Sequence, residues 1–301
     1  MLAGSLPADA ERLGPERAPP GPSAPGDALT DRYVFDAATP RRREAALDDL
    51  RAGFTAWRLA WALARLDLRN RYRGSIIGPF WMTLSTVLML GGLGALYSRL
   101  LGLTLADYLP HLAVSLVVWS AISGVVTDAC TAMINAEGVI RQIRVPYTVH
   151  ALRSVFRNVL TAAHSLPMIL VVFVIFGYMP GPVALLAIPG LLLLLVNAFF
   201  ASLLLGMVCA RFRDIGPIVQ NIIQLAFFMT PVLWKPELLK ELAVWLPLNP
   251  FFAILETIRG PLLEGGGPPL AWVAAVLYTA VLGTVAIAFF MRFRGRLAFW
   301  V

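Results

Sequence analysis

Long apolar runs that contain almost no charge are the feature that most constrains the fold of this chain. Each run is long enough to cross the roughly 30 Å hydrocarbon core of a bilayer as a helix. The composition agrees, because 58% of the residues are hydrophobic and only 14% are charged. The sequence therefore predicts an all-α integral membrane protein with six transmembrane helices. The predicted spans are Phe80–Tyr97, His111–Met133, Val155–Tyr178, Val183–Ala210, Ile215–Trp234 and Ala271–Met291.

The charges between the spans predict their orientation. Cytoplasmic loops of membrane proteins concentrate Arg and Lys, and arginines cluster at every second connection of this chain. In the other connections the few basic residues, such as Arg99 and Arg259, are accompanied by acidic ones. The arginines assigned to the inside are Arg58, Arg65, Arg69, Arg71, Arg73, Arg141, Arg144, Arg153, Arg157, Arg211, Arg213, Arg292, Arg294 and Arg296. This alternation predicts a multi-pass protein of the cytoplasmic (inner) membrane with both termini in the cytoplasm. The net charge of +7 lies at membrane edges rather than on one soluble face, which argues against nucleic acid as a partner.

The chain before the first span divides into two parts. Residues 1–43 are rich in Pro, Ala and Gly, a composition that predicts a disordered tail. Residues 44–73 predict an amphipathic helix lying in the inner membrane interface. Its apolar positions are Leu50, Phe54, Trp57, Trp61, Ala64 and Leu68. The alternative is a helix packed on the protein's own body, and residues 74–301 form the six-helix domain in either case.

Two connections carry distinctive patterns. In the cytoplasmic connection between the second and third spans, Ile140, Ile143 and Val145 alternate with polar residues up to Pro146. This pattern is typical either of a short surface helix through which a soluble, energy-supplying partner acts on the membrane domain, or of an ordinary solvated loop. Between the fifth and sixth spans, prolines divide an apolar segment into pieces too short to span. We expect two short helices dipping into the outer leaflet, with Glu256 and Arg259 forming a local ion pair.

Polar residues inside the predicted spans are few. Asp128 lies near the inner end of the second span, where satisfaction by neighbouring polar groups is favoured over a proton relay. Gln220, Asn221 and Gln224 lie in the fifth span. They indicate either hydrogen bonds between helices or a hydrated pathway.

Several kinds of chemistry have no sequence support. The only lysines are Lys235 and Lys240, so the Gly-Lys-Ser or Gly-Lys-Thr of a P-loop ATPase does not occur. The three histidines show no metal-ligand spacing, and no nucleophile elbow or catalytic carboxylate pair stands out. Both Cys130 and Cys209 fall inside predicted spans and are interpreted as small buried apolar residues. We therefore expect neither an enzyme nor a bound metal.

A family resemblance rests on the segment that leads into the first span. Here Arg71-Tyr72-Arg73-Gly74-Ser75 is followed by Ile77-Gly78 and Trp81. This segment resembles the permease subunits of ABC-2 type polysaccharide exporters, which include O-antigen, capsule and teichoic-acid exporters, although that family commonly has Leu where Ile77 stands. The resemblance covers about Leu50 to Val301. Further matches are Arg141–Pro146, Leu248–Phe251 with Glu256 and Arg259, and Arg292–Trp300.

The resemblance implies an ATP-driven exporter of an undecaprenyl-pyrophosphate-linked polysaccharide. Two copies of the chain would form the channel and two copies of a separate ABC ATPase would bind ATP and Mg, so this chain itself would hold no cofactor. The residues that the resemblance assigns to coupling with the ATPase are Glu137, Ile140, Arg141, Gln142, Arg144 and Pro146. Those assigned to an outer gate of re-entrant helices are Asn249, Pro250, Glu256 and Arg259.

Substrate contacts follow from the same resemblance. Arg69, Tyr72 and Arg73, beside the Ile77-Gly78 turn, would recognise the pyrophosphate, because guanidinium groups bind phosphate oxygens bidentately. The alternative is that these arginines only set the topology. Candidate channel residues are Gln220, Asn221, Gln224, Phe227 and Phe228, the aromatic ones through stacking on sugar faces or, alternatively, as packing or lipid contacts.

Two further functions compete with this one. An ABC-2 drug or lipid exporter would share the topology and the separate ATPase but would not depend on glycan synthesis. A secondary carrier would respond to ion gradients, and the scarcity of charge inside the spans disfavours it.

Overall fold

The computed structural model describes residues 42–74 and 80–301, all of which belong to the compact unit Ala38–Val301. Within these residues the secondary structure is helical and no strand occurs. The predicted tail therefore lies almost wholly outside the described residues. The elements are α1 (Arg42–Thr55), α2 (Trp57–Arg71), α3 (Phe80–Leu100), α4 (Leu105–Thr131), η2 (Ile134–Ala136), α5 (Glu137–Gln142), α6 (Tyr147–Ile175), η3 (Pro182–Leu186), α7 (Ala187–Arg211), α8 (Ile215–Met229), η4 (Pro236–Leu248), α9 (Pro250–Leu263), α10 (Pro269–Phe293), η5 (Arg294–Arg296) and α11 (Leu297–Trp300).

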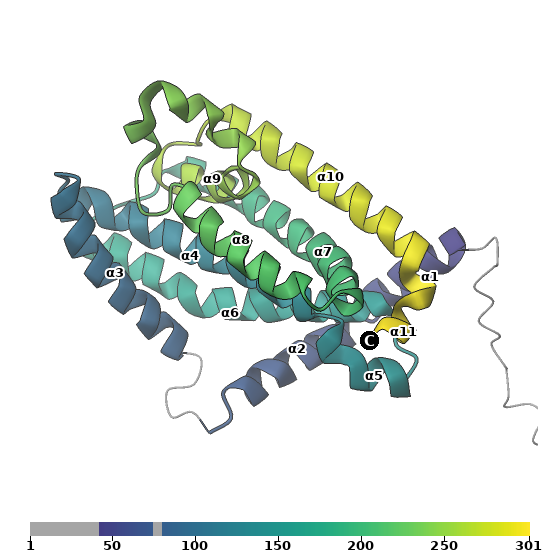
Figure 1. Cartoon of the computed structure of the whole chain (residues 1–301). Helices are drawn as coiled ribbons and strands as arrows, with labels where there is room; N and C mark the ends of the chain where they lie inside the picture. Colours follow the sequence, from purple (N-terminus) through teal and green to yellow (C-terminus); the bar gives the residue numbers. More distant parts are fainter. Residues whose placement is uncertain (1–41, 75–79) are drawn as a thin grey trace, which may run out of the picture. The chain divides into compact units, whose positions relative to one another are not determined.

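Helix α4 is the centre of the bundle (Figure 1). It packs against α3, α6, α7, α8 and α9, and a continuous stretch from Pro110 to Trp119 is buried. A helix that is apolar on every side is stable only where other helices surround it or where lipid does. Its sequence fits this position, because Leu, Val, Ala and Trp side chains point in all directions around the axis.

Small residues allow α10 to approach α7. The buried positions of α10 recur every three or four residues and therefore lie on one face. They are Ala271, Ala275, Thr279, Gly283, Ala286 and Phe290. Asn197 on α7 donates a hydrogen bond of 2.7 Å to the hydroxyl of Thr279. Close backbone approach together with one interhelical hydrogen bond is the usual way in which helices associate within a membrane.

The segment predicted as one interface helix forms two helices, α1 and α2, which meet around Ala56. Ala60 and Ala64 of α2 are fully buried, and α2 packs on α6. Trp61 contacts the ring of Phe156 edge to face with centroids 5.4 Å apart, whereas Trp57 remains about half exposed. The small face of α2 is therefore bound to the protein's own body, as in the alternative interpretation of this segment.

Within the described residues, four segments are long and apolar enough to cross a membrane, or five if the bent pair of η4 and α9 is counted as one span. The four are Leu105–Thr131, Tyr147–Ile175, Pro182–Arg211 and Pro269–Trp300, and they coincide with four of the six predicted spans. Helices α3 and α8 occupy the first and fifth predicted positions but are not among the four. The fold is an all-α membrane protein, and the count of six spans stays a prediction.

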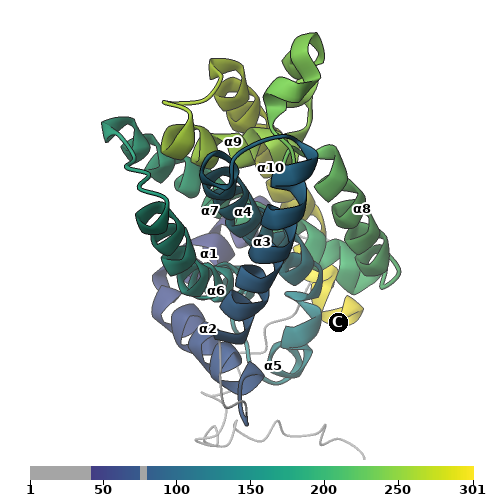
Figure 2. The same cartoon turned by 90° about the vertical axis from the view of Figure 1, so that its left-hand side faces the viewer.

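The two ends of the bundle are formed by different elements (Figures 1 and 2). The end of α2, together with α5 and α11, lies at one end, which we call the arginine-rich end. Helix α9 lies at the opposite end, where it follows η4 after a bend of 111°. Asn249 fixes this bend, because its side-chain oxygen accepts hydrogen bonds from the backbone N–H groups of Phe251 and Phe252 at the start of α9.

Candidate functional site

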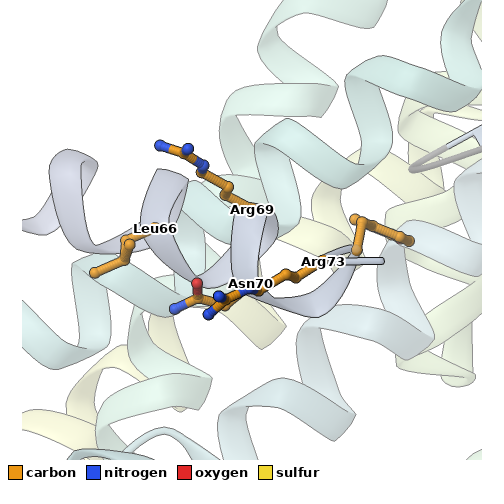
Figure 3. Close-up of a pocket in the computed structure, with 5 residues that line it drawn as sticks. Leu66, Arg69, Asn70 and Arg73 are labelled. Atoms are coloured by element: carbon orange, nitrogen blue, oxygen red, sulfur yellow. The ribbon is translucent and has the colours of Figure 1, made fainter. Parts of the chain in front are cut away.

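The last turns of α2 carry the residues predicted to recognise a phosphate head group. Figure 3 shows the hollow that they line, with a volume of about 490 Å³. Its lining residues are Leu66, Arg69, Asn70, Tyr72 and Arg73. Arg69 and Arg73 are exposed, so their guanidinium groups are open to an anion. The structure thus brings three of the five predicted head-group residues together, and Ile77 and Gly78 lie outside the described residues.

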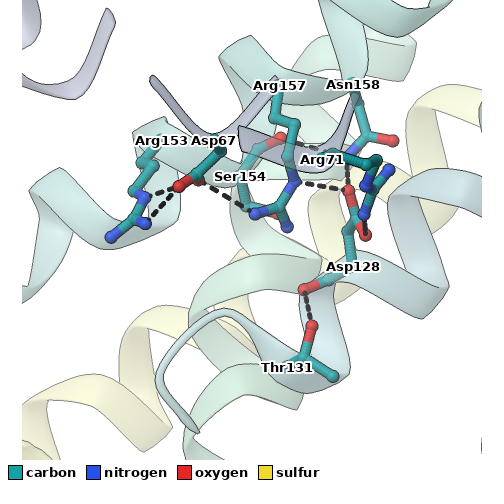
Figure 4. Close-up of polar contacts among 8 residues, drawn as sticks. All are labelled: Asp67, Arg71, Asp128, Thr131, Arg153, Ser154, Arg157 and Asn158. Atoms are coloured by element: carbon teal, nitrogen blue, oxygen red, sulfur yellow. Dashed lines mark hydrogen bonds and ion pairs between the residues drawn. The ribbon is translucent and has the colours of Figure 1, made fainter. Parts of the chain in front are cut away.

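A partly buried ion-pair network holds α2 in place (Figure 4). Arg157 of α6 lies between two carboxylates from different helices. Its Nη1 is 3.2 Å from Asp67 of α2, and its Nε is 2.9 Å from Asp128 of α4. Arg153 forms a bidentate contact with Asp67, because its Nε and Nη2 donate to the two carboxylate oxygens. Because a bidentate pair fixes the orientation of both side chains as well as their distance, the network sets the orientation of α2 against α4 and α6.

The carboxylate of Asp128 has both hydrogen-bond and ion-pair partners. Besides Arg157, it accepts a hydrogen bond of 3.1 Å from the amide of Asn158, and Arg71 approaches to 3.8 Å. The interpretation that neighbouring polar groups satisfy Asp128 is confirmed. The sequence places Arg153 and Arg157 on the cytoplasmic side at the start of the third span, which it predicts to begin at Val155; the helix instead begins at Tyr147, and α6 contains both residues. A sequence signal existed, since Arg153 and Arg157 are four residues apart and share one helix face.

The start of α6 depends on another charged residue that the sequence did not single out. Asp49 of α1 accepts hydrogen bonds from the backbone N–H groups of Tyr147 and Thr148, which are among the unpaired donors at a helix start. The same carboxylate is 2.9 Å from Arg294. Asp49 therefore joins α1, α6 and the segment after α10 at the arginine-rich end.

The predicted coupling segment forms a helix of only six residues, α5. It contains Glu137, Ile140, Arg141 and Gln142, while Arg144 follows it and Pro146 caps α6. Arg141 is 2.9 Å from Glu137 and donates a hydrogen bond of 2.6 Å to the carbonyl oxygen of Val301. Ile143 beside it is 60% exposed. This short helix thus presents polar and apolar side chains outward while it is bonded to the end of the chain.

The predicted channel residues lie on α8. Gln220, Asn221 and Gln224 are exposed, and none of them makes a side-chain hydrogen bond to another described residue. Within the described residues, these three side chains therefore do not form the hydrogen bonds between helices that one interpretation of them expected. Phe228 is 68% exposed, whereas Phe227 packs against Trp119 with ring centroids 5.7 Å apart.

The residues predicted for an outer gate lie at the bend before α9 and within that helix. Asn249 donates a hydrogen bond of 3.0 Å to Thr230, and Pro250 is the first residue of α9. The predicted pair of Glu256 and Arg259 is present. Both side chains are buried, and Arg259 also donates to the carbonyl oxygen of Pro231 and the hydroxyl of Ser115. The pair therefore belongs to a larger buried cluster rather than to a local contact on one helix.

These features define a polytopic α-helical membrane protein that has a basic hollow and a short exposed helix at one end. Residues 58–263 match the ABC-2 type transporter family, and the chain belongs to that family. It is similar to the O-antigen export system permease protein RfbA of Myxococcus xanthus, with 26% identity over 71% of this chain and 85% of that protein. Two proteins of the same name from Klebsiella pneumoniae are 22% and 23% identical over 77% of this chain and 90% of theirs.

Proposed function

We propose that this chain is the channel-forming subunit of an ATP-driven exporter that moves an undecaprenyl-pyrophosphate-linked polysaccharide across the cytoplasmic membrane. The observation that carries the substrate class is the hollow lined by Arg69 and Arg73 in a member of the ABC-2 type transporter family. The relatives named as O-antigen export permeases support the same class. In this proposal the chain has six spans and both of its termini are cytoplasmic.

The head group would bind at the arginine-rich end. Arg69 and Arg73 offer planar donors that suit two neighbouring phosphates, and Asn70 and Tyr72 add neutral hydrogen-bonding groups to the same hollow. Binding would require α2 to keep its position when the negatively charged head group enters the hollow. The pairing of Asp67 with Arg153 and Arg157 meets this requirement, because it ties α2 to α6 without using the arginines of the hollow.

Energy would come from a separate ATPase that binds ATP and Mg. Two copies of that subunit would lie beneath two copies of this chain and push on α5. Ile143, Arg141 and Gln142 are exposed and are available for such a contact. The hydrogen bonds from Arg141 to Val301 would carry the movement to α11, which packs on α7.

The polysaccharide would pass along the exposed side of α8, between this chain and its second copy. Gln220, Asn221 and Gln224 would then meet water or sugar instead of lipid, and Phe228 would offer a face for stacking. The bent pair of η4 and α9 would form the outer gate.

Deletion of the gene, with restoration as the control, tests the substrate class. The measurement is lipid-linked glycan inside the cell together with polymer at the surface. Internal accumulation with surface loss is expected. Unchanged glycan in both places would instead favour the drug or lipid exporter.

The substitution Arg73→Ala tests the head-group site. Loss of a charge-assisted hydrogen bond costs about 1.5 to 3 kcal/mol, so we expect export to fall about tenfold or more. Membrane insertion and co-purification of the ATPase should be retained. Arg51→Ala, which removes an exposed arginine of α1, is the matched control and should export normally. Normal surface glycan in the Arg73→Ala strain would contradict the assignment.

A further inference from the structure

Three charged side chains near the end of α9 form a cluster, and two of them, Glu256 and Arg259, lie in the segment that the proposed function makes the outer gate. We call Glu256, Arg259 and Glu264 the α9 polar cluster. Arg259 is fully buried and Glu256 is 1% exposed, whereas the side chain of Glu264 is 30% exposed. Arg259 binds Glu256 through Nη2, and its Nε is 3.9 Å from Glu264. Two carboxyl groups thus converge on one buried guanidinium group.

The hydrogen bonding of this cluster is incomplete if both carboxyl groups are ionised. Glu256 Oε2 accepts from Arg259, but the buried Oε1 of Glu256 has no hydrogen-bond donor among the described residues. A buried acceptor without a donor is costly. Glu264 Oε1 is 3.9 Å from Nε of the same guanidinium group that binds Glu256, so both carboxyl groups lie beside one cation. Because two ionised carboxylates offer only acceptors, a hydrogen bond between them requires a proton.

We propose that Glu256 and Glu264 share one proton, and that this proton holds the end of α9 in place at the end of the bundle opposite the arginine-rich end. A proton on Glu264 gives the buried carboxylate of Glu256 its missing donor. It also leaves one negative and one positive charge in the cluster, since the second carboxyl group is neutral. The α9 polar cluster is therefore a proton-binding site, and it stands independently of which molecule the protein exports.

The surroundings of Glu264 favour its protonated form. Burial, and then the negative charge of Glu256, raise the pKa of Glu264 from its ordinary value of 4.5 to about 7, although Arg259 acts in the opposite direction. Glu237 of η4 adds a further negative charge. The phenol of Tyr178, which donates to the carbonyl oxygen of Leu263, completes the set facing Glu264. Its own pKa is raised by burial and by Glu264, so it stays neutral in this range.

Loss of the proton would act on the connection between α9 and α10. Two ionised carboxylates against one guanidinium repel each other, and Glu264 is the member that can move toward solvent. It is followed by Gly265, Gly266 and Gly267, all with positive φ, which give the chain freedom to move. On the other side of Arg259 lie Ser115 and the carbonyl of Pro231, with His111 and Lys235 nearby. If Arg259 moves with Glu264, its hydrogen bonds to Ser115 of α4 and to Pro231 after α8 are lost. α9 is then held less firmly against both segments.

The expected pH dependence has a definite sign. A pKa that is raised in the folded state means that folding strengthens proton binding. The stabilisation is fully present below about pH 4.5 and is lost as the pH rises to about 7, above which stability levels off.

The test uses the full-length protein in lipid nanodiscs. Infrared spectroscopy follows the carbonyl band of a protonated carboxylic acid, and thermal unfolding is measured from about pH 5 to about pH 8. We expect a band that disappears with a midpoint near pH 7 and a melting temperature that falls across this range. Glu264→Gln, which imitates the protonated side chain, should lose the band and the fall in melting temperature. Glu241→Gln, on an exposed residue of η4, is the matched control and should resemble the unchanged protein.

Either of two results would overturn the proposal. One is a melting temperature that falls equally with pH in Glu264→Gln and in the unchanged protein. The other is a band that is absent or that survives in Glu264→Gln. Glu256→Gln gives a further check, since removal of its negative charge should move the midpoint of the band toward the ordinary range of a glutamic acid. An unmoved midpoint would show that Glu256 is not the partner.

Discussion

Arg157 illustrates how single side chains organise the arginine-rich end. Its side chain is 8% exposed, and both carboxylates that it joins, those of Asp67 and Asp128, are 17% exposed. Removal of a charge from water is costly, and mutual pairing with well-aligned hydrogen bonds is what offsets that cost. Asp49, which caps α6 and binds Arg294, follows the same principle. At this end, buried acidic residues position the basic helices.

Replacement of Arg157 should therefore be strongly destabilising. In Arg157→Leu both carboxylates lose a partner, and we expect a loss of about 3 kcal/mol in the free energy of unfolding, as for other broken buried ion pairs. Unfolding in mixed micelles with increasing sodium dodecyl sulfate measures this difference. The control is Arg65→Leu on an exposed position of α2, which should change little. Equal stability of the two variants would mean that the network does not hold α2.

At the scale of elements, the packing of α9 depends on close backbone contact. α9 contacts α4, α7 and α10, so most of its length is buried. At Gly190 of α7, a Cβ atom would lie 2.7 Å from the carbonyl carbon of Thr257 on α9. Only glycine permits this approach, because no flexible side chain can move aside. Small residues at helix contacts serve the same purpose throughout membrane bundles.

The substitution Gly190→Ala tests this contact. The added methyl group would force α7 and α9 apart, and overpacking of this kind costs about 2 kcal/mol. Gly91→Ala on α3 is the control, because its Cβ would meet open space and alanine favours helix by about 1 kcal/mol. Thermal unfolding in nanodiscs should therefore show a lower melting temperature only for Gly190→Ala. A similar melting temperature in both variants would contradict the close packing.

At the scale of the whole molecule, the membrane topology depends on whether α3 and α8 cross the bilayer. Both are helices at predicted spans, but α8 has only 15 residues and α3 is not among the four long apolar segments. If both cross, the chain has six spans and its termini lie on one side. If either does not, the sidedness of every later connection is reversed.

Cysteine labelling in intact cells distinguishes these arrangements. With Cys130 and Cys209 replaced, single cysteines are introduced at Asn70, Asp107, Arg213 and Glu241. An impermeant reagent should label Asp107→Cys and Glu241→Cys, which flank α3 and α8 on the outside, but not Asn70→Cys or Arg213→Cys until the cells are opened. Labelling of both members of either flanking pair from the same side would mean that the helix between them does not cross.

The sequence predicted well whatever depends on neighbouring residues. The break at Pro146 was readable because a helix start or stop is a local event. The hollow formed by Arg69, Tyr72 and Arg73 followed from one short motif. The sequence did not reveal the partners of the helices, and it did not reveal that Arg157, at the start of the predicted third span, is buried in α6 and joins two carboxylates.

The sequence by itself determined that this chain is a helical membrane protein, because apolar length and the position of arginines act through lipid and water, which every segment meets independently. Its short motifs carried the resemblance to the ABC-2 family. Only the tertiary structure decided which charges meet. Asp67 and Arg153 are 86 positions apart, and Ser115 and Arg259 are 144 apart. Such pairs depend on how each helix is rotated against its neighbours, which is fixed by the packing of Ala60, Ala64 and Gly190 rather than by any local pattern.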